Sequence, residues 1–291
     1  MARYYHYDGL APENLSEIPC PVCLGEARDF VADDNGFTIA RCRTQDCRFV
    51  YVNPRPNAVE LAIFYDKYYD PGDVVPEKWE VEMEDIVRET CDWLCADRPA
   101  GTVLDVGCSF GHLLVQMERQ GWKTVGVEPS AVAADHARRH LAGEVIVAGF
   151  EDAALAPGSF DAVVSLYVLE HVADPRGFVE KIHRVLVPGG QAVLRMPFTS
   201  PLFWLHKVLR RPLMYAPMHL NDFSPTAIGR LARGLGFRQV EVRVGRPRKS
   251  HDVVENVGAR LLGGVGRAVE RASGGQLTFP YTGAFSYRLW K

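Results

Sequence analysis

The segment from Val103 to Gly111, VLDVGCSFG, narrows the choice of folds more than any other part of this 291-residue chain. An apolar run typical of a buried strand ends at the carboxylate of Asp105, and helical residues follow the turn. Gly107 and Gly111 permit backbone conformations and close approaches that a Cβ atom would block. We therefore predict a strand, a tight turn and a helix. Open α/β sheets bind ligands at such places, beside the carboxyl end of a strand.

Short apolar runs continue to alternate with amphipathic segments after this turn. Because strands that alternate with helices form parallel sheets covered on both faces, the pattern predicts an α/β fold. A helical pattern broken at residues 71–72 precedes this region. The expected strands are 102–106, 124–127, 145–147, 162–166 and 192–196, with closing strands 237–244 and 283–290; the expected helices are 59–96, 111–119, 131–141, 178–186 and 227–235.

The second of these strands ends at another carboxylate, Glu128, 21 residues after Gly107. A carboxylate at that distance can accept hydrogen bonds from both hydroxyls of a ribose. The turn lacks the G-x-G-x-x-G spacing of dinucleotide-binding loops, and no G-K-[S/T] of a P-loop occurs. The sequence therefore excludes both of those phosphate-binding loops.

Five motifs together resemble the class I S-adenosylmethionine (SAM)-dependent methyltransferases. They are LDVGCSFG (104–111), VGVEPS (125–130), GFEDAAL (149–155), SFDAVVSLYVLEHVADP (159–175) and VLVPGGQAVL (185–194). The resemblance implies a Rossmann-like sheet with a parallel core and a closing antiparallel strand. It also implies an enzyme that uses SAM as its methyl donor.

By this resemblance a set of residues is expected to bind the cofactor. The glycine turn would hold the methionine part, Glu128 the ribose, and the segment after residue 149 the adenine. The end of the fourth core strand would line the pocket. Ser109 stands where the family has a glycine, and we expect it to fit the turn with a negative φ. The expected cofactor residues are Asp105, Gly107, Cys108, Gly111, Glu128, Phe150, Glu151, Asp152, Ser165 and Tyr167.

Four cysteines near the N-terminus have the spacing of a zinc ribbon: Cys20 and Cys23 form C-x2-C, and Cys42 and Cys47 form C-x4-C. Four thiolates fill a tetrahedral Zn²⁺ shell, so this metal would be structural. A segment with so little apolar mass needs such support to fold. A ribbon before a SAM-binding domain resembles a subgroup of bacterial small-molecule and sugar methyltransferases.

Two histidines are candidates for general-base catalysis, because the pKa of imidazole is close to neutral pH. His171 follows the fourth core strand, and His219 precedes a predicted helix N-cap at Ser224. A base is needed only when the methyl acceptor is a hydroxyl or a protonated amine. For each histidine a purely structural role is an open alternative.

The charge composition of the chain bears on which molecules it can bind. Thirty-three Lys and Arg against 36 Asp and Glu give a net charge of −3, which provides no global field for a nucleic acid backbone. We expect a small-molecule or carrier-linked substrate. Nucleic-acid methylation and a non-catalytic SAM-binding module are the alternatives. The N-terminus resembles no signal peptide, so we expect a cytoplasmic location. The oligomeric state is left open.

The sequence predicts consecutive modules: a zinc ribbon over 1–56, a helical linker over 57–98 and the methyltransferase domain over 99–291. Residues 198–222 form an insertion in that domain. Its part 201–218 combines aromatic and aliphatic residues with Lys207, Arg210 and Arg211 and contains no acid. This segment could be a lid over the substrate, a peripheral membrane contact or a dimer contact.

Overall fold

The computed structural model describes residues 11–68, 75–96, 98–208, 210–246, 248, 253–273 and 284–291. The chain divides into two compact units, each built from separated stretches of sequence. Unit 1 combines Met1–Val75, Glu170–Arg176 and Pro197–Leu231, and unit 2 combines Pro76–Leu169, Gly177–Met196 and Ala232–Lys291. The module boundaries after residues 56 and 98 stay a prediction.

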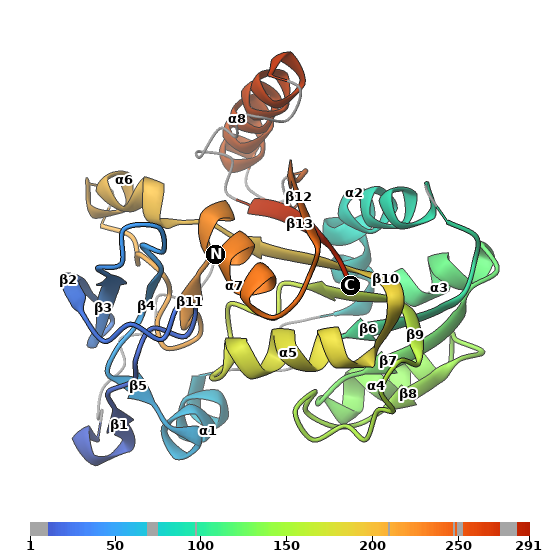
Figure 1. The fold of residues 1–291 in the computed structure, drawn as a ribbon, viewed down its shortest axis with the longest axis horizontal. Coiled ribbons are helices and arrows are strands. Elements are labelled where there is room, and N and C mark those ends of the chain that lie inside the picture. The colour runs from blue at the N-terminus through green and yellow to red at the C-terminus, as the bar shows by residue number, and fades with distance from the viewer. Residues whose placement is uncertain are drawn as a thin grey trace. The chain divides into compact units, whose positions relative to one another are not determined.

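Unit 2 contains a seven-stranded sheet in the order β12-β13-β10-β9-β6-β7-β8, shown in Figure 1. The neighbours from β10 to β8 are parallel, and β12 pairs antiparallel with β13. This confirms the predicted Rossmann-like sheet with its antiparallel closure. The strands are β6 (Thr102–Val106), β7 (Lys123–Val127), β8 (Glu144–Ile146), β9 (Phe160–Leu166), β10 (Leu186–Pro197), β12 (Gln239–Val244) and β13 (Ala284–Trp290).

Helices follow the strands as the alternation predicts: α3 (His112–Arg119), α4 (Ala131–Arg138), α5 (Pro175–Val185) and α7 (Pro225–Gly234). Ser130 caps α4 by accepting a hydrogen bond from the Ala133 N–H, and Ser224 does the same for Ala227 in α7. The preceding helix α2 (Pro76–Cys95) buries Ile86 and Leu94 in the same core cluster as Leu114 of α3. The same cluster contains Val103 of β6 and Val193 of β10, so it packs α2 and α3 against the central strands.

A long helix, α8 (Val253–Ala272), was not predicted from the sequence. Its glycine-rich stretch 263–266 has low helix propensity, and for this reason the sequence did not predict a helix here. Leu261 and Val265 are exposed on it.

Unit 1 contains a four-stranded sheet in the order β11-β4-β3-β2 and a two-stranded pair, β1 with β5. The insertion predicted over 198–222 belongs to this unit and supplies the edge strand β11, which pairs with β4. The elements are β1 (Leu15–Ser16), β2 (Arg28–Asp34), β3 (Phe37–Cys42), β4 (Val50–Val52), β5 (Arg55–Pro56), α1 (Ala58–Tyr68), α6 (Phe203–Val208) and β11 (Asn221–Asp222), with 3-10 turns at Pro12–Asn14 and Ser200–Leu202.

The insertion is anchored by a buried carboxylate and by apolar packing. Asp34 accepts hydrogen bonds from the backbone N–H groups of Leu213, Met214 and Ala216 at 2.8–3.1 Å. Leu213 and Met214 are buried in one cluster with residues of the sheet, as is Phe203. Some of the apolar side chains that suggested a lid or a membrane contact are therefore buried in the core of unit 1.

Two apolar side chains of the insertion, Trp204 and Val208, are exposed by 62% and 73%. Lys207, Arg210 and Arg211 are exposed as well. No helix in the described part of the chain has both the length and the apolar character needed to cross a bilayer. The lid, membrane and dimer roles of 201–218 stay predictions.

Candidate functional site

The turn after β6 requires its two glycines. Gly107 has φ +76°, and a Cβ atom there would lie 2.5 Å from the Val168 side chain. Gly111 has φ +84°, and its Cβ would press on Ala137 and Leu141 at 3.0 and 3.1 Å. The N–H groups of Gly107 and Cys108 both donate to the Val127 carbonyl, which ties the turn to the end of β7. The turn therefore lies close to its neighbours in a shape that a larger residue would change.

The expectation for Ser109 was wrong, because its φ is +49° rather than negative. A left-handed backbone is unfavourable for a residue with a Cβ atom. The Ser109 N–H donates to Glu128 Oε2 at 2.9 Å, and this bond to a carboxylate helps to stabilise the conformation. The serine thus keeps the turn that a glycine would adopt freely.

Two buried carboxylates lie at the ends of adjacent strands β6 and β7. Asp105 and Glu128 are only 4% and 8% exposed. Burial, and to a lesser degree the negative charge of Glu128, raise the pKa of Asp105 to about 8. Burial also raises the pKa of Glu128, although hydrogen bonds from the N–H groups of Ser130 and Ser109 act in the opposite direction. Near neutral pH the ligand-free Asp105 therefore keeps its proton, and a positively charged ligand beside the pair would favour the charged carboxylate.

The segment predicted to lie beside an adenine has one buried and two exposed side chains. Phe150 is buried and packs edge-on against Phe178 of α5, with ring centroids 4.9 Å apart. Glu151 and Asp152 are exposed. Lys181 Nζ donates to the backbone carbonyls of Phe150, Glu151 and Ala153, and so fixes the path of this segment. Lys181 was not singled out in the sequence.

At the end of β9, Tyr167 has a left-handed backbone with φ +60°. Its N–H donates to the Arg195 carbonyl, and its hydroxyl accepts from Arg195 Nε at 2.9 Å. Ser165, two residues earlier, is buried, and within the described residues its hydroxyl has no hydrogen-bond partner. Arg195 is a positioning residue that the sequence analysis missed, since nothing local marks an arginine inside an apolar strand.

The side chain of Cys108 is buried in the core of unit 2, and the predicted cofactor contact of this residue stays a prediction. It is 5% exposed, and its Sγ lies where a Cβ on Gly126 would come within 2.6 Å. Burial raises the pKa of its thiol. Its contacts are those of packing.

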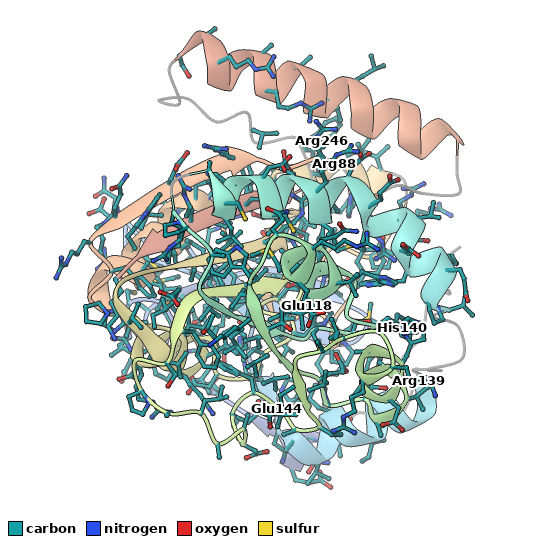
Figure 2. The ribbon with its side chains drawn as sticks, turned by 90° about the vertical axis from the view of Figure 1, so that its right-hand side faces the viewer. Arg88, Glu118, Arg139, His140, Glu144 and Arg246 are labelled. Carbon is teal, nitrogen blue, oxygen red and sulfur yellow. The ribbon has the colours of Figure 1, made fainter. Side chains whose placement is uncertain are left out.

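A cavity of about 580 Å³ in unit 2 is bounded by α2, α3 and α4. His112 and His136 line it, as does His140, which is labelled in Figure 2. Asp105 and Glu128 do not line it. This cavity is therefore distinct from the place where the two carboxylates meet.

The four N-terminal cysteines of unit 1 come together as predicted. Cys20 Sγ and Cys47 Sγ are 3.6 Å apart, Cys23 Sγ and Cys42 Sγ are 3.5 Å apart, and all four sulfurs lie within 4.8 Å of one another. None of the four forms a disulfide. Tetrahedral Zn²⁺ with bonds of about 2.3 Å would place its thiolates ~3.7 Å apart. The geometry of the cysteine quartet fits that ion.

The two candidate histidines also lie together in unit 1. Their ring centroids are 4.8 Å apart and nearly perpendicular. His171 Nδ1 is 2.7 Å from the Met218 carbonyl, and His219 is hydrogen-bonded to the Met214 backbone. Burial lowers the pKa of both rings, and the proximity of His171 lowers that of His219 further. Both are therefore neutral near pH 7, and because a carbonyl only accepts, His171 keeps a lone pair on Nε2.

The histidine segments are joined by residues that sequence reasoning missed. The Glu170 carbonyl accepts from the N–H groups of Leu220 and Asn221 at 2.7 and 3.1 Å. The buried guanidinium of Arg55 bonds to the carbonyls of Ala173 and Leu220 and to Asn221 Oδ1. More than a hundred residues separate Arg55 from these partners, so no local pattern could reveal the contact.

Sequence comparisons identify methyltransferases that are similar to this chain. The sequence family described as "Methyltransferase domain" matches residues 77–242, more than half of the chain. A ubiquinone biosynthesis O-methyltransferase of Pseudomonas paraeruginosa is 30% identical over 185 residues, covering 56% of this chain and 79% of the relative. The enzyme of that name from Ralstonia nicotianae is 27% identical, covering 71% and 94%.

Solved structures agree on the fold. Phosphoethanolamine N-methyltransferase 2 of Haemonchus contortus, in complex with SAM, has a TM-score of 0.55 at 18% identity, covering 83% of this chain and 62% of that one. A SAM-dependent methyltransferase of Archaeoglobus fulgidus has a TM-score of 0.50 at 16% identity, covering 76% and 100%.

The residues around the glycine turn fit the SAM cofactor of these relatives. Asp105 and Glu128 are buried carboxyl groups whose charged forms would be stabilised by a cation that carries a sulfonium and an ammonium group. Each Glu128 oxygen accepts one backbone N–H and has a second lone pair for a ribose hydroxyl. The positive φ of both glycines and the space around them favour glycine at these two positions of the turn.

Asp105→Asn should stabilise the ligand-free chain more at pH 9 than at pH 5. In the wild type the folded state keeps a proton on Asp105 up to a pKa of about 8, whereas an unfolded chain releases it near the ordinary value for aspartate. Stability therefore falls as the pH rises between those values, by up to about 1.4 kcal/mol per pH unit, and the amide removes that loss.

The measurement is the melting temperature of both chains at the two pH values. Asp152→Asn, at an exposed acid of the same unit, is the control and should give equal differences from wild type at both. If Asp105→Asn also gave equal differences, the burial argument for Asp105 would be wrong.

Proposed function

The chain belongs to the methyltransferase domain family, and we propose that it transfers the methyl group of SAM to a hydroxyl oxygen of a small-molecule acceptor. The observation that carries the proposal is the similarity to two O-methyltransferases, together with the carboxylate pair at the glycine turn. Oxygen as the acceptor atom comes from the names of those relatives. Nothing in the chain favours the nucleic-acid alternative.

SAM, when bound, supplies an electrophilic methyl group on a positively charged sulfur. Asp105 and Glu128 bind and orient it through charge and hydrogen bonds, and the turn at Gly107 permits the close approach. In-line displacement gains most of its rate from holding the reacting atoms at near-attack distance in a pocket without water. The loss of the acceptor's hydroxyl proton requires a further group.

We assign that role to the two histidines. His219 is neutral near pH 7 and has one ring nitrogen free of the Met214 backbone, so it can accept a proton. His171 is its neighbour and keeps its own lone pair on Nε2. The proposed cytoplasmic location and carrier-linked substrates stay predictions.

The function is tested by incubating the chain with SAM and a library of hydroxylated metabolites, and by following S-adenosylhomocysteine together with product mass. O-methylated product supports the proposal. Binding of SAM without any product, or methylation only at nitrogen, contradicts it.

Glu128→Gln should weaken SAM binding by about tenfold or more in calorimetry. The amide replaces one carboxylate oxygen with an NH₂ group, which would face a backbone N–H of Ser109 or Ser130 and leave that donor without its acceptor. Glu144→Gln, at the exposed glutamate that opens β8 (Figure 2), is the matched control and should bind as wild type. Equal affinity in the Glu128 variant would remove this residue from the cofactor site.

His219→Ala should reduce turnover far more than it reduces affinity for SAM, because the ring acts on the acceptor and not on the cofactor. The measurement is kcat beside the Kd of SAM. His206→Ala is the control, since His206 is also half-buried in unit 1 and bonded to a backbone carbonyl. Wild-type turnover in the His219 variant would exclude it from catalysis.

We further propose that the cysteine quartet holds one structural Zn²⁺. The sulfur spacing given above supports it, and four thiolates leave no position for substrate. Cys42→Ser should lose the metal and lower the melting temperature of unit 1, whereas Cys95→Ser, outside the quartet, should keep it. The readout is zinc per chain by elemental analysis, and full zinc in the Cys42 variant would contradict the assignment.

A further inference from the structure

Three potential metal ligands outside the cysteine quartet converge in unit 1. One ligand atom each from Glu170, His171 and His219 lies within 4.8 Å of the other two. They come from two segments separated by nearly fifty residues of chain. The hydrogen bonds from Leu220 and Asn221 to the Glu170 carbonyl hold those segments together. We name this set the Glu-His-His cluster.

Glu170 is a buried acid, and no cationic side chain of the described residues forms an ion pair with it. Its side chain is 1% exposed, and Oε2 has no hydrogen-bond partner among the described residues. Oε1 lies 3.9 Å from His171 Nε2, which is too far for a hydrogen bond. A carboxyl group so enclosed is costly unless a proton or a cation neutralises it. A bound cation beside Glu170 would therefore stabilise its charged form.

The two imidazoles are oriented as metal ligands usually are. Histidines that bind metals commonly give their other ring nitrogen to a backbone carbonyl or a carboxylate, which fixes the tautomer and the ring direction. His171 has this arrangement through the Met218 carbonyl at 2.7 Å, and His219 through the Met214 backbone. For His171 the lone pair is therefore on Nε2, the nitrogen nearest to Glu170.

We propose that the Glu-His-His cluster binds one first-row divalent cation through one carboxylate oxygen and two imidazole nitrogens. Around such an ion at ~2.1 Å, tetrahedral ligands would be about 3.4 Å apart. The 3.9 Å between Glu170 and His171 is about half an ångström longer, which small side-chain rotations can close. Three ligands leave the coordination shell open, and His171 is 30% exposed, so an outside oxygen ligand can reach the ion.

The ligand atoms of the Glu-His-His cluster differ from those of the cysteine quartet, so the two sites should prefer different metals. Mixed nitrogen and oxygen ligands suit Mn²⁺, Fe²⁺ and Zn²⁺, whereas four thiolates select zinc and do not suit Mn²⁺. In the reaction, and resting on the proposed function, the open position would bind the acceptor hydroxyl and lower its pKa, so that it loses its proton more readily. The hydroxyl proton would then pass to solvent water, and holding the ion would replace the general-base role proposed above for the two histidines.

Mn²⁺ binding tests the site without any turnover. The full chain, with zinc in its quartet, is titrated with MnCl₂ while the EPR signal of free Mn²⁺ is followed, and CoCl₂ absorption serves as a second probe. We expect one ion per wild-type chain. We expect at least tenfold weaker binding in both Glu170→Gln and His171→Gln, and wild-type binding in the matched control His206→Gln. Circular dichroism and SAM calorimetry show whether each variant is folded.

The possible results distinguish failure of the metal site from failure of the proposed methyl transfer. No binding of Mn²⁺ or Co²⁺ by the wild type, or wild-type binding by folded Glu170→Gln, overturns the site. If Glu170→Gln fails to fold, His171→Gln, at a partly exposed ring, decides in the same way. A chain that binds Mn²⁺ but gives no heat with SAM disproves methyl transfer and keeps the metal site. A chain that binds SAM and forms product without binding either ion disproves the metal site alone.

Discussion

The bond from the Ser109 N–H to the Glu128 carboxylate is the interaction on which the cofactor turn depends. It joins the loop after β6 to the end of β7, and the second oxygen of Glu128 does the same for Ser130, the N-cap of α4. One buried acid therefore fixes two backbone segments. Because these bonds need a carboxylate at this position, the acid supports the structure of the turn as well as the affinity for a ligand.

Two residues without glycine's freedom, Ser109 and Tyr167, have left-handed backbones at the ends of β6 and β9. Such conformations cost about 1–3 kcal/mol and persist only where neighbours stabilise them. Glu128 stabilises the first, and Arg195 the second, through the backbone and the phenol. The strain lies at the carboxyl ends of parallel strands, where open α/β sheets bind their ligands.

The fold could be predicted well because its signals are local. The β6 strand runs over the predicted residues 102–106, and each of the other core strands and helices lies within six residues of its expected bounds. The cysteine quartet was equally visible, since ligand spacing is a property of short segments. Arg55 and Glu170 were missed because their partners lie far along the chain, and Ser109 was misjudged because a neighbouring strand provides its support.

The buried acids of the two units share one physical property. Other glutamates of unit 2 pair with arginines, as the half-buried Glu241 does with Arg288 and the buried Glu82 with Arg248. Within the described residues, Asp105 and Glu128 have no such ion pair, and Glu170 has only a neutral imidazole nearby. A buried acid without a cation either keeps its proton or lowers stability, so a cation from outside would stabilise the charged form of these groups. The proposed sulfonium cofactor would provide such a cation at the first pair, and the proposed divalent ion would provide it at Glu170.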